Sequence, residues 1–276
     1  MARNRTVTPD PLPEFDKPPV IEVVCGMMFK PLEAMLAPHL GLLWEKFKAE
    51  YPRCQEVAPL APIVEQFDEA SPMQIELTET PPLPRIWFVH TDETGIVQVQ
   101  RDRFLHNWKK VRPTDQYPRY KNVIELFRQR LALFEAFLEE QQLGSIEPRQ
   151  YELTYVNHIP QGNGFATLGE LRNVFPDFAW QSAPRRFLPT PETINWRTAF
   201  TLPDRAGRLH VTIRNARRRD DKTPILLLEL TARGVPKDTS RDAMWVWFET
   251  AHQWIVRGFT DITDEAMHKK VWKRAR

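Results

Sequence analysis

Two segments of this 276-residue chain carry the same order of strand-like and helical patterns, and this repetition restricts the possible folds more than any other feature. Each segment opens on a strand-like run with glutamate at its second position, IEVVCGMMFK at 21–30 and YELTYVNHIP at 151–160. A helical stretch, three more strand-like runs and a long helix rich in aromatic residues follow in each. The order predicts an α+β fold made of two β-α-β-β-β-α units.

The turns inside the two units agree best. DETG at 92–95 leads into IVQVQR, and DRAG at 204–207 leads into RLHVTIR. Both read as tight turns followed by a strand of alternating polarity. Because an open antiparallel sheet must bury its apolar side, we expect an internal duplication that forms one curved antiparallel sheet with two long helices packed on one face. Two unrelated α+β domains are the alternative, since the match is in pattern and few residues are identical.

Periodicity places the elements. In the first unit, strands are predicted at 20–29, 73–77, 86–89 and 96–101, and helices at 31–51 and from 119 to 143. In the second unit, strands are predicted at 151–159, 196–202, 208–215 and 225–232, and helices at 167–175 and 241–258. Both long helices carry a broad apolar stripe that only the sheet is large enough to cover. We therefore expect Phe127 and Trp247 to be buried against strands of their own unit.

The chain divides into four segments on this interpretation. Residues 1–19 contain five prolines and are predicted to form an extended arm. The first unit covers 20–146, the second 147–260, and 261–276 is a basic tail. Hydrophobic residues are 42% and charged residues 27% of the chain, as in globular proteins.

No secretory signal or membrane span is visible in the sequence. The N-terminus lacks the apolar run of a signal peptide, and no segment approaches the roughly 20 apolar residues of a spanning helix. Cys25 and Cys54 form no CxxC pair, and Cys25 lies in an apolar strand, which predicts a reduced, buried thiol. We expect a soluble cytoplasmic protein with no membrane partner.

The sequence contains no recognisable catalytic or metal-binding motif. Its seven histidines are scattered, with no HxH, HExxH or Cys–His cluster. The glycines at 162 and 164 indicate a loop more than a nucleotide-binding fingerprint, and GxSxG is absent. We therefore predict no catalytic residue, no metal and no cofactor, and favour a binding protein over an enzyme.

Two basic groups follow corresponding hairpin strands. The first comprises Arg101, Arg103, Lys109 and Lys110 with Trp108 among them, and the second comprises Arg214, Arg217, Arg218 and Arg219. In a duplicated fold they would be related by a pseudo-two-fold axis and would suit a phosphate backbone or an acidic protein surface. The alternative is solvated strand ends neutralised by nearby acids.

A third group lies on a central strand. Tyr155, Asn157 and His158 combine polar and aromatic side chains near the middle of the chain, as residues of a ligand pocket do. The alternative is that they are partly buried residues whose hydrogen bonds are satisfied within the fold.

Several segments resemble a sporadically distributed family of bacterial proteins of about this length. They are PLPEFDKPPVIEVVCGMMFKPL, RFLHNWKK, YPRYKNVIELF, YELTYVNHIP and AHQWIVRGFTDIT. The resemblance covers essentially the whole chain and brings no catalytic residue with it. Patchy distribution is typical of mobile loci, such as antiphage defence or toxin–antitoxin loci, which implies an accessory subunit whose protein partner is encoded by a neighbouring gene. The duplicated order is also similar to the TATA-binding-protein-like saddle, with one strand fewer per unit and no paired intercalating phenylalanines, and fold alone does not imply function.

Three functions therefore stand as hypotheses. The first is a non-catalytic, cytoplasmic binding or accessory subunit; with a net charge of only +2, a protein partner is ahead of nucleic acid. The second is a nucleic-acid-binding protein that uses the paired basic groups. The third is a small-ligand binder or enzyme with a site between the repeats, at Tyr155, Asn157 and His158.

Overall fold

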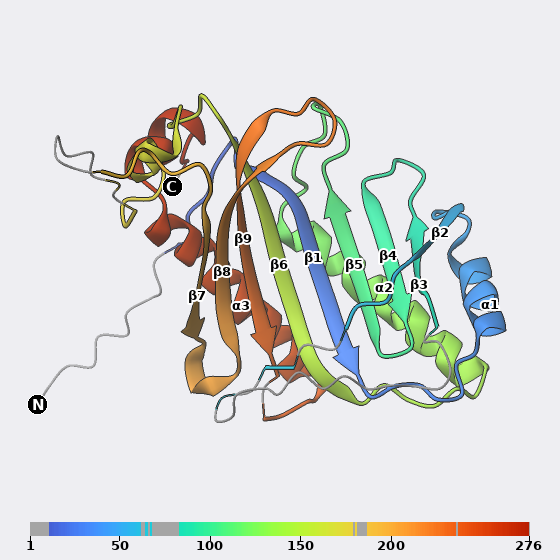
Figure 1. Cartoon of the computed structure of the whole chain (residues 1–276). Coiled ribbons are helices and arrows are strands. Elements are labelled where there is room, and N and C mark those ends of the chain that lie inside the picture. The colour runs from blue at the N-terminus through green and yellow to red at the C-terminus, as the bar shows by residue number, and fades with distance from the viewer. Residues whose placement is uncertain are drawn as a thin grey trace, which may run out of the picture.

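The computed structural model describes residues 11–61, 64–65, 67, 83–178, 180, 187–235 and 237–275. The strand predicted at 73–77 lies outside these residues. The described strands are β1 (Val20–Phe29), β2 (Arg53–Val57), β3 (Arg85–Val89), β4 (Gly95–Gln100), β5 (Arg103–Lys109), β6 (Pro148–Pro160), β7 (Asn195–Thr201), β8 (Arg208–Arg217) and β9 (Pro224–Gly234). Over the described residues they form one open, nine-stranded antiparallel sheet in the order β2-β3-β4-β5-β1-β6-β9-β8-β7 (Figure 1). The chain is thus a mixed α+β fold.

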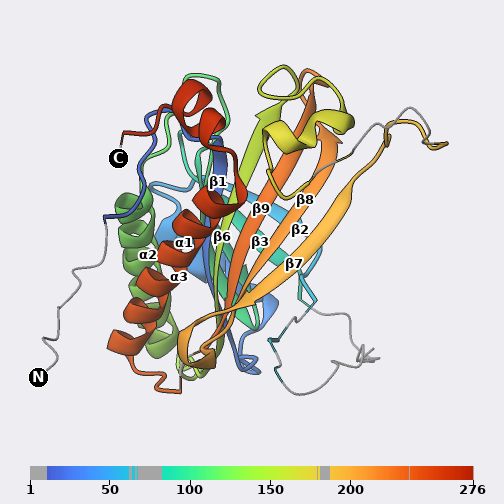
Figure 2. The same cartoon turned by 90° about the vertical axis from the view of Figure 1, so that its left-hand side faces the viewer.

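Three α-helices and three short helical turns complete the described fold. They are α1 (Ala37–Phe47), α2 (Tyr120–Glu140) and α3 (Arg241–Ile262), with the short turns η1 (Leu168–Asn173), η2 (Pro203–Arg205) and η3 (Met267–Val271). Pro38 lies in the first turn of α1, where its missing N–H removes no helical hydrogen bond. Ser240 caps α3 by accepting the Ala243 N–H. Figure 2 shows the helices beside the sheet.

The strand pair β1–β6 forms the middle of the sheet. Val23, Cys25, Met27 and Phe29 of β1 are buried on one face, as the alternating pattern predicts, and Met28 on the other face is buried as well. The helix α2 packs on β5 and β1, and α3 packs on β6, β9 and β8. The predicted burial of Phe127 and Trp247 is confirmed, with exposed fractions of 0% and 3%.

Two strands are present that the sequence pattern did not predict. Strand β2 is an edge strand whose residues are exposed or half-exposed, so it lacks the apolar alternation of a half-buried strand. Strand β5 follows β4 after only two residues, and its buried polar residues His106 and Asn107 interrupt the apolar pattern. The segment predicted as a helix at 167–175 is a shorter 3-10 turn, η1.

The N-terminal residues 11–19, hereafter the docked segment, lie against the C-terminal end of the described chain. Backbone hydrogen bonds join Asp16 N–H to Lys273 O (3.0 Å), Lys17 N–H to Trp272 O (3.0 Å) and Ala275 N–H to Glu14 O (2.8 Å). The Phe15 side chain is 6% exposed. Segments at opposite ends of the sequence are thereby fastened together.

No helix among the described residues combines the length and the apolar composition that crossing a bilayer requires.

Candidate functional site

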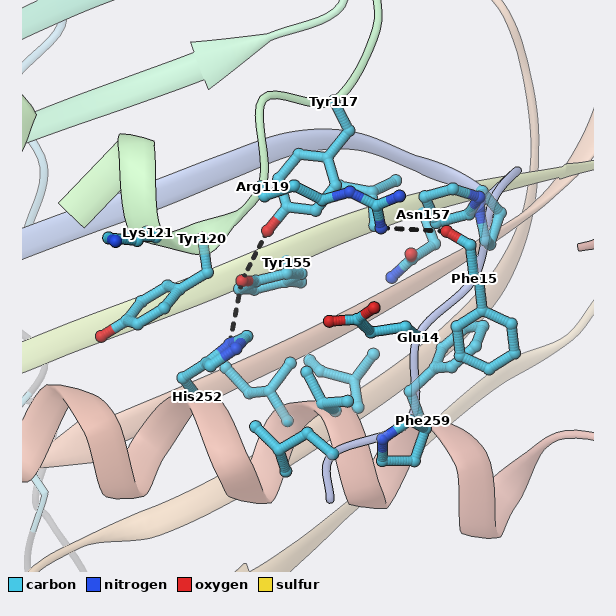
Figure 3. Close-up of a pocket in the computed structure, with 18 of the residues that line it drawn as sticks. Glu14, Phe15, Tyr117, Arg119, Tyr120, Lys121, Tyr155, Asn157, His252 and Phe259 are labelled. Atoms are coloured by element: carbon cyan, nitrogen blue, oxygen red, sulfur yellow. Dashed lines mark hydrogen bonds between the residues drawn. The ribbon is translucent and has the colours of Figure 1, made fainter. Parts of the chain in front are cut away.

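A cavity of about 690 Å³ lies between the central strands, the start of α2, the helix α3 and the docked segment (Figure 3). The docked segment supplies one wall through Pro11, Leu12, Pro13, Glu14 and Phe15. Helix α3 supplies one stripe, since its lining residues are spaced three and four apart: Glu249, His252, Ile255, Val256 and Phe259. The cavity is therefore built from both ends of the chain and from its middle.

Three side chains in the cavity wall form a chain of hydrogen bonds. The Tyr117 and Tyr155 hydroxyl oxygens are 2.9 Å apart, and the Tyr155 hydroxyl is 3.1 Å from His252 Nδ1. In Figure 3, Tyr117 from the loop before α2, Tyr155 from β6 and His252 from α3 point toward one another. The Tyr120 ring stacks on His252 at 3.8 Å with an angle of 9° between the planes. These contacts fix the orientation of all four rings.

The three hydrogen-bonded groups are uncharged at neutral pH. Burial lowers the pKa of His252 from its ordinary 6.5 to about 4. Burial also raises the pKa of the Tyr155 and Tyr117 hydroxyls well above 10. The arrangement therefore offers neutral hydrogen-bond donors and acceptors and no fixed charge.

The structure brings together two of the three pocket residues predicted on the central strand. Tyr155 and Asn157 both line the cavity, because residues two apart on a strand share a face. Asn157 is 1% exposed, and its Nδ2 donates to Leu228 O at 3.2 Å. His158 lies one position on and points to the opposite face of the sheet, where burial and then Arg218 lower its pKa. It is not part of this site.

The charged lining residues are exposed. Glu14, Arg119, Lys121 and Glu249 line the cavity and keep much of their surface in water. Arg119 Nη1 donates to Phe15 O at 2.9 Å and so ties the docked segment to the start of α2. The Arg119 backbone has φ 70° and ψ 152°, a conformation that costs a non-glycine residue of order 1–3 kcal/mol. Such strain is common where a chain is held in place for a function.

Sequence analysis missed most of this site. His252 lies among the apolar residues of the α3 stripe, and a polar ring at that position is a usable signal. Tyr117 and Arg119 precede α2 in the run YPRY, where the sequence gives no indication that Tyr117 contacts β6 or that Arg119 contacts the docked segment. Phe15 stands alone among prolines, so no periodicity marks it as a buried residue.

The first basic group is divided between the two ends of β5. Arg101 and Arg103 lie at its start and Lys109 and Lys110 at its end, about 20 Å apart along a strand of seven residues. Arg103 Nη2 donates to Ala61 O at 3.3 Å, and its Nε lies 3.3 Å from Asp102 Oδ1. Arg101 Nη2 donates to Met35 O at 3.3 Å.

Trp108 requires a correction. Its side chain is 7% exposed and packs against Tyr117 with ring centroids 5.5 Å apart. It belongs to the apolar face of β5, so the ring is not available to stack on a base at the surface. The expected combination of surface aromatic and basic residues is therefore not formed there.

The second basic group remains together at the end of β8. Arg214, Arg217 and Arg219 are exposed. Arg218 forms an ion pair with Asp221, whose pKa is lowered first by hydrogen bonds from Thr223 and then by Arg218. Arg217 Nη1 donates to Lys222 O at 3.2 Å. Local neutralisation thus accounts for part of the positive charge.

In the part of the chain that the structure describes, no group of three or more His, Cys, Asp or Glu side chains is arranged to hold a metal ion. Cys25 is buried as predicted, and burial raises the pKa of its thiol. Comparison of the chain with family models, curated proteins and solved structures gave no match in any of the three. The assignment of a function therefore starts from the cavity itself.

Proposed function

We propose that this protein binds a small organic molecule in the cavity between the central strands, α3 and the docked segment. The observation that carries the proposal is the cavity of about 690 Å³ beside the Tyr117–Tyr155–His252 hydrogen bonds. Small-molecule sites typically measure 300–1,000 Å³ and combine an apolar lining with a few placed polar groups. This cavity falls within that range and combines an apolar lining with a few polar groups, which favours a ligand.

The polar groups of the cavity are held by secondary structure and not by loops alone. Tyr155 and Asn157 come from the central strand β6, and His252 comes from the middle of the 22-residue helix α3. Groups held in this way keep their geometry before a ligand arrives, which reduces the entropy lost on binding. Polar groups that are held in place in this way support ligand binding as the function, and we propose no chemical reaction for the site.

Two tryptophan substitutions on α3 test the proposal. Val256 lines the cavity, so Val256→Trp should fill it, whereas Val246 is 65% exposed on the same helix and Val246→Trp should not. N-phenyl-1-naphthylamine, whose fluorescence rises in apolar sites, serves as the probe. We expect Val256→Trp to weaken probe binding by at least about tenfold, or 1.4 kcal/mol, and Val246→Trp to leave it unchanged. Equal binding by both variants would place the probe elsewhere and reject the cavity as the site.

The same geometry supports an internal duplication. Counted outward from the centre, one half of the sheet reads β1, β5, β4, β3 and the other reads β6, β9, β8, β7. In each half the chain starts at the centre, moves to the edge and returns strand by strand before its long helix, and the DETG and DRAG turns occupy equivalent places. Phe127 of α2 and Phe248 of α3 have ring centroids 5.4 Å apart, which supports two long helices side by side on one face. Strand β2 would then be an addition to the first unit.

The other two functional hypotheses stay predictions. Among the described residues we find no surface feature that specifically supports a protein partner encoded at a mobile defence-type locus. Nucleic-acid binding would depend mainly on Arg214, Arg217 and Arg219, because the first basic group is divided and Trp108 is buried.

A further inference from the structure

The inner wall of the cavity has polar atoms but no buried charge. Its polar groups include the Tyr117 and Tyr155 hydroxyls, the His252 imidazole and the Asn157 amide, and Asn157 is almost fully buried. All four are uncharged near pH 7, since the imidazole titrates only near pH 4. An ionic group placed against them would lose its hydration without gaining a counter-ion, at a cost of several kcal/mol.

The charges that do line the cavity are balanced and lie in water. Two acidic residues, Glu14 and Glu249, and two basic residues, Arg119 and Lys121, line the cavity, and all four are exposed. Arg119 already donates to Phe15 O. Exposed charges of both signs are screened by solvent and give little selection for an anion or a cation.

Five aromatic side chains, Phe15, Tyr117, Tyr120, Tyr155 and Phe259, lie in the wall among prolines and aliphatic side chains. Phe15 and Phe259 meet edge to face with centroids 5.5 Å apart, and Tyr117 meets Tyr155 in the same manner at 6.2 Å. Aromatic groups prefer offset or edge-to-face neighbours at such separations. A planar ring can therefore join this set without disturbing it.

The hydrogen-bond chain ends on a group that can adapt to its ligand. If His252 Nδ1 accepts from Tyr155, Tyr155 accepts from Tyr117, and the Tyr117 oxygen is left to accept a further bond. With the other imidazole tautomer the order reverses, and the Tyr117 hydroxyl donates instead. An amide or hydroxyl on the ligand suits either direction.

We infer that the ligand is an uncharged, planar aromatic molecule that carries a hydrogen-bonding group, such as an amide or hydroxyl, placed against Tyr117. The inference rests on the proposed binding function and specifies the chemical class that the site selects.

Three competitors of matched shape test this class against the N-phenyl-1-naphthylamine probe. They are 2-naphthamide, which is neutral, 2-naphthoate, which is an anion of nearly the same shape, and (2-naphthyl)methylammonium, which is a cation. We expect the amide to displace the probe at a concentration at least about tenfold lower than either ion. Tyr117→Phe should weaken the amide by a factor of about 2–10, the effect of one neutral hydrogen bond, and leave the ions unchanged.

The outcomes separate the two proposals. If either ion competes as well as the amide, or the amide does not compete, the class is wrong while cavity binding stands. If Val256→Trp leaves probe binding intact, the cavity is not the site and both proposals fail. Circular dichroism melting of each variant confirms that a lost signal does not come from unfolding.

Discussion

Replacement of Phe15 by alanine should release the docked segment while the sheet stays folded. The Phe15 ring meets Phe259 at 5.5 Å, His268 at 5.5 Å and Trp272 at 6.3 Å between centroids, each near edge to face. Truncating a buried phenylalanine costs about 3–5 kcal/mol. The other ties of the segment that the structure describes are mainly backbone hydrogen bonds, with Arg119 donating to Phe15 O. Phe15 is the one side chain of residues 11–19 that is buried, so we expect its ring to contribute a large share of the docking free energy.

A loss of about 3–5 kcal/mol shifts the docking equilibrium by roughly 10²–10⁴-fold, because 1.36 kcal/mol corresponds to a factor of ten. Hydrogen exchange followed by mass spectrometry should show faster exchange at the Asp16, Lys17 and Ala275 amides, which donate across this contact, with β1 and β6 unchanged. Dissociation of N-phenyl-1-naphthylamine should accelerate as well, because Phe15 forms part of the cavity wall. Asp16→Ala is the matched control, since Asp16 is exposed and its contact is made by the backbone N–H.

The reasoning would be refuted if Phe15→Ala left exchange at 11–19 unchanged. A single cooperative loss of stability across the whole sheet would also contradict it, because the docked segment would then be an integral part of the core.

Three further predictions follow. Because the His252 pKa is lowered from 6.5 to about 4, the unfolded chain binds more protons than the folded chain between these pH values. The contribution of His252 to the free energy of unfolding should be complete above pH 6.5 and fall by up to about 3 kcal/mol as the pH drops toward 4. Urea unfolding of His252→Phe should show a smaller loss over this range, and the remaining loss should include the contribution of His106, whose pKa is lowered to about 3. Trp247→Ala should cost about 3–5 kcal/mol in denaturant unfolding, since it removes a buried ring and the Nε1 hydrogen bond to Ala206 O, and an unchanged midpoint would contradict the packing of α3. If the chain binds nucleic acid, a gel shift at low salt should disappear when Arg217, Arg218 and Arg219 are changed to glutamate; no shift with the wild-type chain on DNA or RNA would end that hypothesis.

Much of the sheet was predictable because local signals and tertiary structure agree. Strands β1 and β6 alternate with period two, and the turns at 92–95 and 204–207 contain residues that favour tight turns. Strand β5 was not predicted because its core positions include His106, which is buried although polar. No local pattern distinguishes such a histidine from a surface residue.

The site was predictable only where it follows strand periodicity. Tyr155 and Asn157 share a face of β6, and His158 does not, so the alternation itself separates them. Tyr117, His252 and Phe15 reach the cavity from three distant segments, and their meeting depends on the packing of the whole chain. The first basic group shows the converse, because its residues are close in sequence but lie at opposite ends of β5.

The fastening of residues 14–17 to residues 272–275 also sets an order of events during synthesis. Phe15 is translated before the whole sheet, whereas Phe259, His268 and Trp272, the rings around it, are translated after the sheet. The proline-rich segment must therefore wait, with its phenylalanine unburied, while almost all of the sheet is translated and able to fold. Closure of the cavity wall therefore follows translation of all nine described strands, and a nascent chain stalled before residue 272 would present the open side of the site to the surrounding solvent and chaperones.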